Sequence, residues 1–554
     1  MQKKSYLVII FLIGILVTLH LNGHSLNSLV AMGENIFIKM QIFNLILQEL
    51  QQSYVEEVNP VELIEDAIKG MLSNLDPHTT YLSREQFEIW QQKFNGFIGF
   101  GIHYNYIRGN LIITSVIENS PAEQAGIWAN DQIIAIDAEK VSGLKQIEIE
   151  QKLTGKAGDT INLTIQRNGT VLSHNFTLKR EQISLNSVNQ AFMITEDIGY
   201  IQLSKFTALT REEMVTALQK LEQRGFKKLV LDLRQNGGGL MQAAIDVVDL
   251  FLPGKRKILY KKGRSKDSFE VYYSTGQTQF IQLPLIVLID HASASSSEIV
   301  AGAIQDWDRG LIIGEPSFGK GLVQSQIRFA DNSALLMTTA KYYTPCGRLI
   351  QRDYQTKTKE QYYHEAYNDS IRDSLSRQHE LPQFKTIQGR TIFGGGGIHP
   401  DVIVKLKYPE VSPELRNLYY YSKTRVPVIN IFVEDYIRNN KLGFSVSDKN
   451  DVKALNRFIN TFALDSELFD HLKKIINEVQ FPIKDLSHEE NKADLEFLLM
   501  REIASRIWGE YGHFKVKLTR DDQLLQALAH FPQTEQLLET SLTMYRHHQD
   551  FAPY

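Results

Sequence analysis

Apolar strand candidates alternate with amphipathic helix candidates over roughly residues 183–406, and this alternation strongly constrains how the chain can fold. The strand candidates are IGYIQLSKF, KKLVLDLRQ, PLIVLIDH and LIIGEP, and EEMVTALQKLEQRG and SSEIVAGAIQDW are the helix candidates between them. Strands separated by helices favour a partly parallel sheet with helices packed on it. We therefore expect an α/β core, as one of roughly three or four domains in a chain of this length.

The regions on either side of the core have different patterns. The N-terminal one has apolar residues at helical spacing, the next has short β-rich runs separated by Gly, Asn and Asp, and the last is helical and strongly charged. We predict a multidomain α+β protein. Its parts are a helical segment (33–92), a β-domain (93–181), the core (182–408) and a helical C-terminal extension (409–554).

Residues 1–24 have the pattern of an export signal or membrane anchor. MQKK precedes the 16 mostly apolar residues YLVIIFLIGILVTLHL, a run slightly shorter than the ~17–25 residues of a spanning helix. No persuasive small-x-small cleavage site follows, although a cleaved signal peptide remains an alternative. The N-terminal lysines predict that the rest of the chain lies outside the cytoplasm.

Composition argues against several classes of function. The 60 basic and 64 acidic residues give a net charge of −4 without a basic block, so we expect no nucleic-acid binding. The single cysteine, Cys346, excludes an intrachain disulfide and metal sites built on cysteine pairs. HHQD near the C-terminus has no second ligand pair at workable spacing, so no metal is expected.

GEPSFGKGLVQ (Gly314–Gln324) is a near match to a phosphate-binding loop. Gly321 replaces the hydroxyl residue that would bind magnesium, and LVQSQIRF alternates like a strand where a helix should begin. An exported protein would also meet little ATP. A phosphate-loop nucleotidase is therefore the less favoured interpretation of Lys320.

HASASSSEIVAGAIQD places several serines between an apolar strand and a helix. A serine on a sharp turn there has the next backbone N–H at the positive end of the helix. A lysine can act as its base when desolvation lowers the lysine pKa. The glycines of LVLDLRQNGGGL follow another strand and can supply a further donor to an oxyanion. These features suggest a serine–lysine hydrolase.

Other roles are open for the same residues. A serine at a helix start most often caps the helix, and a lone lysine is usually solvated. His78 or His291 with Asp232 or Asp290 would be a histidine triad, which is less favoured. Glu298 is interpreted as a first-turn carboxylate favoured by the helix dipole.

Roughly from Tyr54 to Asp401, the chain resembles the C-terminal processing (tail-specific) proteases, serine–lysine endopeptidases with an inserted PDZ domain. Eight blocks carry the resemblance in order: LIEDAIKGMLSNLDPHTTYL, FIGFGIHY with SPAEQAGIWANDQIIAID, IGYIQLSKF, LVLDLRQNGGGL, SASSSEIVAGAIQD, GEPSFGKGLVQ, YYTPCGRLIQ and GGGGIHPDV. The family implies a ClpP/crotonase-like α/β protease core.

The resemblance also implies roles for individual residues. Ser295 would be the nucleophile, Lys320 the base and Gln324 the residue that holds the lysine in place. The oxyanion donors would be the backbone amides of Ser296 and of a glycine in Asn236–Gly239, with Gly238 favoured. Three positions depart from the family pattern, since Ser296 replaces alanine, Gly237 replaces proline and Cys346 replaces serine. With Gly237 in place of proline, each of the three glycines 237–239 is a candidate for the second donor.

The PDZ stretch implies recognition of C-terminal tails. Such domains add a peptide as a strand and capture its carboxylate on loop N–H groups. Ile98, Gly99, Phe100, Gly101 and Ile102 resemble this loop and the strand after it, with an apolar pocket for hydrophobic C-terminal residues.

Together these features predict an exported serine endopeptidase of the cell envelope, on the periplasmic side of the inner membrane. It would cleave proteins with apolar C-terminal tails through an acyl-enzyme and need no cofactor or metal. An adaptor or regulator protein and a homo-oligomer are further expected partners. The alternative is a catalytically idle PDZ-bearing scaffold that binds such tails.

Overall fold

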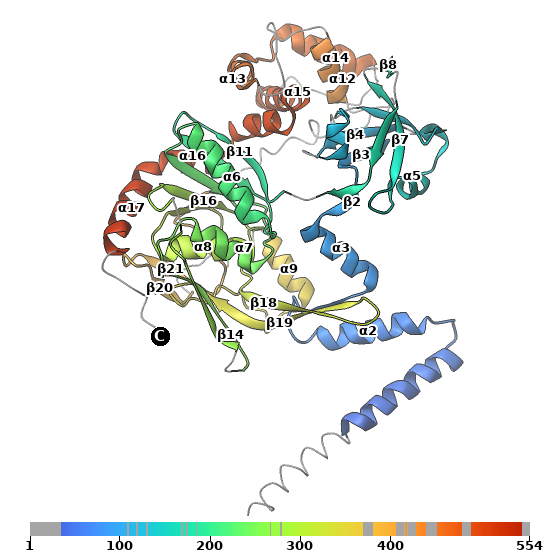
Figure 1. Cartoon of the computed structure of the whole chain (residues 1–554), viewed down its shortest axis with the longest axis vertical. Helices are drawn as coiled ribbons and strands as arrows, with labels where there is room; N and C mark the ends of the chain where they lie inside the picture. Colours follow the sequence, from blue (N-terminus) through green and yellow to red (C-terminus); the bar gives the residue numbers. More distant parts are fainter. Residues whose placement is uncertain are drawn as a thin grey trace, which may run out of the picture. The chain divides into compact units, whose positions relative to one another are not determined.

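The computed structural model divides the chain into two compact units, Met1–Tyr81 and Leu82–Tyr554 (Figure 1). It describes residues 35–107, 110–117, 120–128, 131–167, 170–172, 175–183, 186–265, 268–277, 280–368, 381–405, 415, 418, 428–438, 451–478 and 489–545. The predicted export signal or anchor lies outside these residues. No helix within them is long and apolar enough to cross a membrane.

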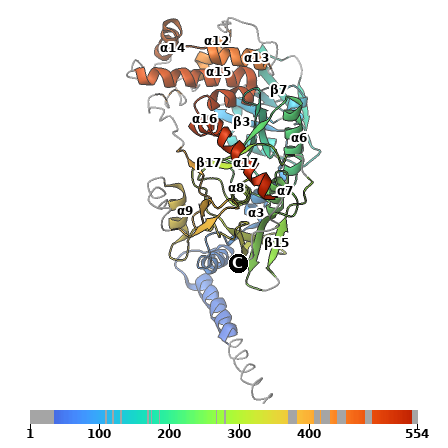
Figure 2. The same cartoon turned by 90° about the vertical axis from the view of Figure 1, so that its left-hand side faces the viewer.

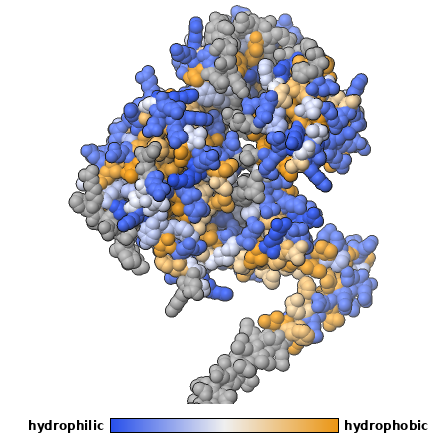
Figure 3. All heavy atoms as spheres, in the orientation of Figure 1, coloured by the Kyte–Doolittle hydropathy of each residue, from blue (hydrophilic) through white to orange (hydrophobic). Residues whose placement is uncertain are grey.

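In the described part of the first unit, residues 35–81, the chain is mainly helical. A helix covers residues 35–53, and α2 (Pro60–Leu72) follows an Asn59 cap whose side chain accepts from the Val61 amide. Many large apolar side chains of these two helices are exposed (Figure 3). Phe37, Leu45 and Met71 are examples. The strand β1 (Thr80–Leu82) contains the boundary between the units.

The second unit begins with α3 (Arg84–Asn95), and a small β-domain follows. Its elements are β2 (Phe97–Gly99), β3 (Ile102–Ile107), β4 (Asn110–Val116), α4 (Pro121–Gln124), β5 (Gln132–Ile136), β6 (Glu139–Lys140), η1 (Val141–Gly143), α5 (Gln146–Leu153), β7 (Thr160–Arg167), β8 (Thr170–Val171), β9 (Phe176–Lys179) and β10 (Glu181–Ile183). Its main sheet has the order β3–β4–β5–β7–β8, with its own apolar core. Because β2 pairs with β10, the chain enters and leaves this domain on adjacent strands.

The predicted α/β core is present. Its sheet has the order β11–β12–β13–β16–β17–β22, in which only β11 runs antiparallel to its neighbour. The strands are β11 (Val188–Met193), β12 (Ile198–Leu203), β13 (Lys228–Asp232), β16 (Leu285–Ile289), β17 (Leu311–Gly314) and β22 (Val402–Ile403). The central strands are apolar on both faces, as buried parallel strands are.

Helices from distant parts of the sequence cover the two faces (Figures 1 and 2). On one face pack α6 (Thr210–Gln223), α7 (Met241–Asp249) and α8 (Ser296–Asp306). On the other pack α16 (Asp522–Ala529) and α17 (Phe531–Tyr545). The predicted boundary at residue 408 therefore separates elements that share one hydrophobic core, and α16 and α17 belong to the α/β core.

Among the described residues of the C-terminal region, four further helices form a separate hydrophobic core, although Leu518 at the end of the last one packs with the sheet. They are α12 (Val428–Arg438), α13 (Val452–Thr461), α14 (Ser466–Glu478) and α15 (Glu489–Leu518).

A second, antiparallel sheet packs against the core. It contains β14 (Lys257–Gly263), β15 (Glu270–Tyr273), β18 (Leu322–Arg328) and β19 (Ala334–Tyr343). The helix α9 (Lys359–Tyr367) and the hairpin β20 (Gln383–Lys385) and β21 (Thr391–Phe393) follow. Because β18 begins two residues after Lys320, a strand stands where a phosphate loop requires a helix.

Candidate active site

Ser295 lies on a sharp turn between β16 and α8. Its φ of 54° and ψ of −110° are unusual for a residue with a side chain. It is the N-cap residue of α8, and it makes these capping contacts with its own backbone atoms. Glu298 N donates to Ser295 O at 2.9 Å, and Ser295 N donates to the Glu298 side chain at Oε2 at 2.7 Å. The strained turn thus presents a serine at the N-terminus of a buried helix.

Lys320 lies beside two residues of the neighbouring strands. Its Nζ donates to Gln324 Oε1 on β18 at 2.8 Å. The Tyr342 hydroxyl on β19 is 2.8 Å from Lys320 O and 3.1 Å from Ser295 O, so one buried donor ties the backbones of both residues together. Burial raises the pKa of Tyr342 well above its usual value, which keeps the hydroxyl protonated.

Glu298 connects the Ser295 turn to the Lys320 loop, a role that the sequence interpretation missed. Its carboxylate is fully buried and accepts four hydrogen bonds, from Ser317 Oγ (2.6 Å), Gly319 N (2.7 Å), Lys320 N (2.9 Å) and Ser295 N. Burial raises the pKa of Glu298, and the four donors oppose this rise. The residue lies in the first turn as expected, but its partners on the Lys320 side are 19 to 22 residues away.

The glycine loop after β13 is fastened to the start of α8 by Asn236. Its carbonyl accepts from Ala294 N at 3.1 Å and from Ser297 Oγ at 2.8 Å, and its side-chain amide donates to Leu203 O at 2.7 Å. Ser296 Oγ donates to Gly239 O at 3.0 Å. The loop and the serine turn therefore form one hydrogen-bonded unit.

Gly238, the favoured oxyanion donor, lies against the Ser295 turn, but its amide already donates to Asn236 Oδ1 at 2.9 Å. A Cβ at this position would be 2.8 Å from Ala294 O and 2.9 Å from Ser295 Cβ, and φ is +100°, so only glycine fits. To act as a donor, the Gly238 amide would have to give up the Asn236 side chain.

Ser295, Lys320, Gln324 and Tyr342 line one cavity of about 370 Å³, together with Gly237 and Gly239. Apolar side chains complete much of the wall: Leu240, Met241, Ile299, Leu322 and Val323. The structure thus brings together the three residues to which the family resemblance gives catalytic roles, next to an apolar surface.

The alternative histidine triad is not assembled around the cavity. Among the described residues, no histidine lines it. His291 Nδ1 lies 3.6 Å from Glu315 Oε2. Asp232 accepts from Arg234, and Asp290 accepts from Gln235 and Ser293.

The predicted peptide-binding stretch divides between two elements. Ile98 and Gly99 belong to β2, which pairs with β10, whereas Phe100 and Gly101 form the turn into β3 at Ile102. The carbonyls of Phe100 and Gly101 accept from Ala122 N (3.0 Å) and Ile117 N (2.8 Å). Because β3 is the end strand of its sheet, it offers an edge to which a peptide strand can be added.

Family models match three parts of the chain: Peptidase family S41 (residues 197–359), PDZ domain (96–178) and Activating protease CtpB N-terminal domain (26–86). The carboxy-terminal-processing protease of Bartonella bacilliformis is 38% identical over 323 residues, which cover 57% of this chain and 74% of that protein. The carboxy-terminal processing protease CtpB of Bacillus subtilis is 34% identical over 55% of this chain and 64% of its own length.

A carboxyl-terminal-processing protease of Picosynechococcus is 38% identical over 52% of this chain and 70% of its own length. Among solved structures, the photosystem II D1 C-terminal processing protease is 25% identical over 67% of this chain and 88% of its own, with a TM-score of 0.34. Fold and matches define a multidomain α+β protease with a PDZ domain. The chain belongs to the carboxy-terminal processing proteases of peptidase family S41.

Proposed function

We propose that this protein is a serine endopeptidase that uses a Ser295–Lys320 dyad and recognises the C-terminal tails of its substrates through the PDZ domain. The observation that carries the proposal is the shared cavity, in which Ser295 stands on its strained turn and Lys320 Nζ is held by Gln324. The apolar wall suits a substrate segment with hydrophobic side chains.

In the proposed reaction the two residues act in turn. In its neutral form, Lys320 would take the proton of Ser295 Oγ while Oγ bonds to the scissile carbonyl carbon. The lysine then gives that proton to the leaving amine as the C–N bond breaks. Water, deprotonated by the same lysine, then attacks the ester carbonyl carbon. As the bond from that carbon to Ser295 Oγ breaks, the lysine returns the proton to Oγ and the new C-terminal carboxylate is released.

The developing oxyanion would be stabilised by the Ser296 amide at the N-terminus of α8 and by one amide of the glycine loop. Gly239 fits this second role better than Gly238, since Gly239 lines the cavity and the Gly238 amide is bonded to Asn236.

The location and partners are also proposals. The apolar segment after MQKK supports an exported enzyme held at or targeted to the membrane, on the periplasmic side. Its substrates would be envelope proteins with apolar C-terminal tails.

Cleavage of an unfolded protein with an apolar C-terminal tail tests the mechanism. The parent should cleave it, and Ser295→Ala and Lys320→Ala should each lose most of the activity, since the two residues act as a unit. Ser325→Ala, on the exposed part of β18, is the control and should cleave like the parent. Activity that survives Lys320→Ala would refute the lysine base. Binding of the tail without cleavage by the parent would favour the scaffold instead.

A further inference from the structure

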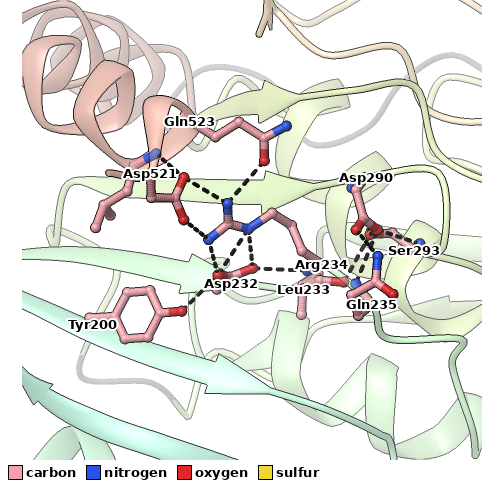
Figure 4. A network of polar contacts seen from close by, with 10 residues as sticks. Tyr200, Asp232, Leu233, Arg234, Gln235, Asp290, Ser293, Asp521 and Gln523 are labelled. Atoms are coloured by element: carbon pink, nitrogen blue, oxygen red, sulfur yellow. Dashed lines mark hydrogen bonds and ion pairs between the residues drawn. The ribbon is translucent and has the colours of Figure 1, made fainter. Parts of the chain in front are cut away.

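Arg234 joins the glycine loop to the C-terminal helix α16 (Figure 4). On one side its Nε donates to both carboxylate oxygens of Asp232 at 3.0 Å. On the other side its Nη1 donates to Asp521 Oδ1 at 2.9 Å and to Gln523 Oε1 at 3.0 Å. Its Nη2 lies 2.7 Å from Asp521 Oδ2. The guanidinium is therefore shared between β13 and a helix 287 residues further along the chain.

This ion pair is buried, which makes its geometry specific. The side chains of Arg234, Asp232 and Asp521 are 10%, 1% and 5% exposed. Burial by itself would lower the pKa of Arg234, but Asp232 and Asp521 raise it well above its usual value, so the guanidinium stays charged. Removing one partner of such a cluster leaves an incompletely compensated buried charge.

Asp521 and Gln523 are themselves held in place. Asp521 caps α16, with Oδ1 accepting from Leu524 N at 3.0 Å. Gln523 Nε2 donates to Val404 O at 2.8 Å. The contact to Arg234 thus comes from a fixed helix terminus rather than from a mobile side chain on the surface.

The residue after Arg234 is fastened to the serine turn. Gln235 has a φ of +60°, and both its amide and its side chain donate to Asp290. Asp290 also accepts from Ala292 N and Ser293 N, in the turn that leads to Ser295. Consecutive residues of the loop are therefore anchored on opposite sides, one to α16 and one to the turn that carries the serine.

We propose that Asp521 and Gln523 are positioning residues for the reaction: by fixing Arg234, they hold the loop Leu233–Gly239 in place against the Ser295 turn. The inference rests on the proposed serine–lysine mechanism. It assigns a part in the active site to residues well beyond the stretch that the peptidase model matches (197–359). Because neither residue lines the cavity, their loss should slow the chemical step and leave substrate binding intact.

The test compares the full-length parent with Asp521→Asn. Asparagine caps a helix as well as aspartate does, so α16 keeps its cap while Arg234 loses a charged partner. We expect kcat to fall on the order of 10- to 100-fold, as small misplacements of catalytic groups do, with KM within about twofold. Hydrogen exchange should rise in peptides covering residues 233–239.

Two further variants sharpen the test. Asp522→Asn removes the same charge from the next, exposed residue and should behave like the parent. Adding Gln523→Glu to Asp521→Asn returns a carboxylate to Arg234 and should recover part of kcat, which a general loss of stability would not allow.

Three outcomes would overturn the inference: parental kcat and exchange in Asp521→Asn, a change confined to KM, or an equal loss in Asp522→Asn. Failure of the proposed function is distinguishable, because then the parent itself would not cleave or would cleave without Ser295. In that case the exchange of residues 233–239 still decides whether Asp521 holds the loop.

Discussion

Glu298 shows how one carboxylate can set the distance between a serine and a lysine. Replacing it in Glu298→Gln leaves one oxygen acceptor for four donors and turns an NH₂ group toward them. Each buried donor left unpaired costs about 1–3 kcal/mol, so we expect both kcat and the free energy of unfolding to fall. Urea unfolding and peptide cleavage measure the two, with the exposed Glu360→Gln as control.

The pKa of Glu298 adds a pH dependence to this prediction. Because burial raises that pKa, the carboxylate takes up a proton at a higher pH than an ordinary glutamate would. A protonated carboxyl presents an O–H donor to partners that are themselves donors and accepts from them more weakly, so activity should fall as the pH drops through the raised pKa. The acid side of the kcat profile should lose this step in Glu298→Gln. An unchanged profile in the variant would contradict the assignment.

The sequence could predict the site only where its residues stand in short motifs. Ser295, Lys320 and Gln324 each belong to such a motif, and the structure gathers all three at one cavity. The role of Glu298 could not be predicted, because it depends on hydrogen bonds to a loop that is about twenty residues further along the chain. The sequence also could not predict that the Gly238 amide is already hydrogen-bonded, since this depends on the orientation of the Asn236 side chain.

At the scale of elements, α16 and α17 complete the core sheet. Phe531, the first residue of α17, is 1% exposed and belongs to the cluster that contains Val230, Ile286 and Leu288 of the sheet. We expect Phe531→Ala to lower the free energy of unfolding by about 3–5 kcal/mol through the cavity it leaves. Denaturant unfolding measures this.

Leu525→Ala is the matched control for the same helix pair, since Leu525 is 48% exposed. It should change the free energy of unfolding by no more than about 0.5 kcal/mol. Equal effects of the two substitutions would mean that α17 does not share the core of the sheet.

The alternation of strands and helices predicted the parallel sheet but only one of the two helical layers that pack on its faces. Strands that are apolar throughout indicate that both faces are buried. The helices between the strands cover one face: α6 and α8, which the sequence pattern predicted, and α7, which it did not identify. The second cover comes from α16 and α17, and no local pattern in a charged helical region identifies the sheet on which it packs.

At the scale of the whole molecule, the PDZ domain is an insertion whose two ends lie together. The chain enters on β2 and leaves on β10, and Gly99 pairs with Glu181 in this ribbon. The turn at Phe100–Gly101, where we propose that the substrate tail binds, therefore directly follows the strand that pairs with β10. The sequence predicted a small β-domain here from its short strands, and the PDZ model matches residues 96–178.

If this turn captures the substrate's terminal carboxylate, the end of the tail should matter for binding but not for chemistry. In the full-length Ser295→Ala chain, a tail peptide with a C-terminal amide should bind about ten- to a hundredfold more weakly than the free acid, since hydrogen bonds to a charged group contribute ~1.5–3 kcal/mol. In the active enzyme the same change should raise KM and leave kcat unaltered, because the scissile bond would be bound and cleaved at the Ser295 cavity and not at this turn.

Two glycine variants locate this effect in the turn. A Cβ on Gly101 would meet Ser120 Cβ at 2.1 Å, whereas one on Gly158, also at positive φ, meets nothing within 4 Å. Both substitutions strain the backbone of the PDZ domain, but only Gly101→Ala also displaces the turn. It should therefore abolish the preference for the free acid, and Gly158→Ala should keep it. Equal binding of acid and amide by the Ser295→Ala chain would mean that the turn does not read the carboxylate, and tails would then have to be recognised by their side chains alone.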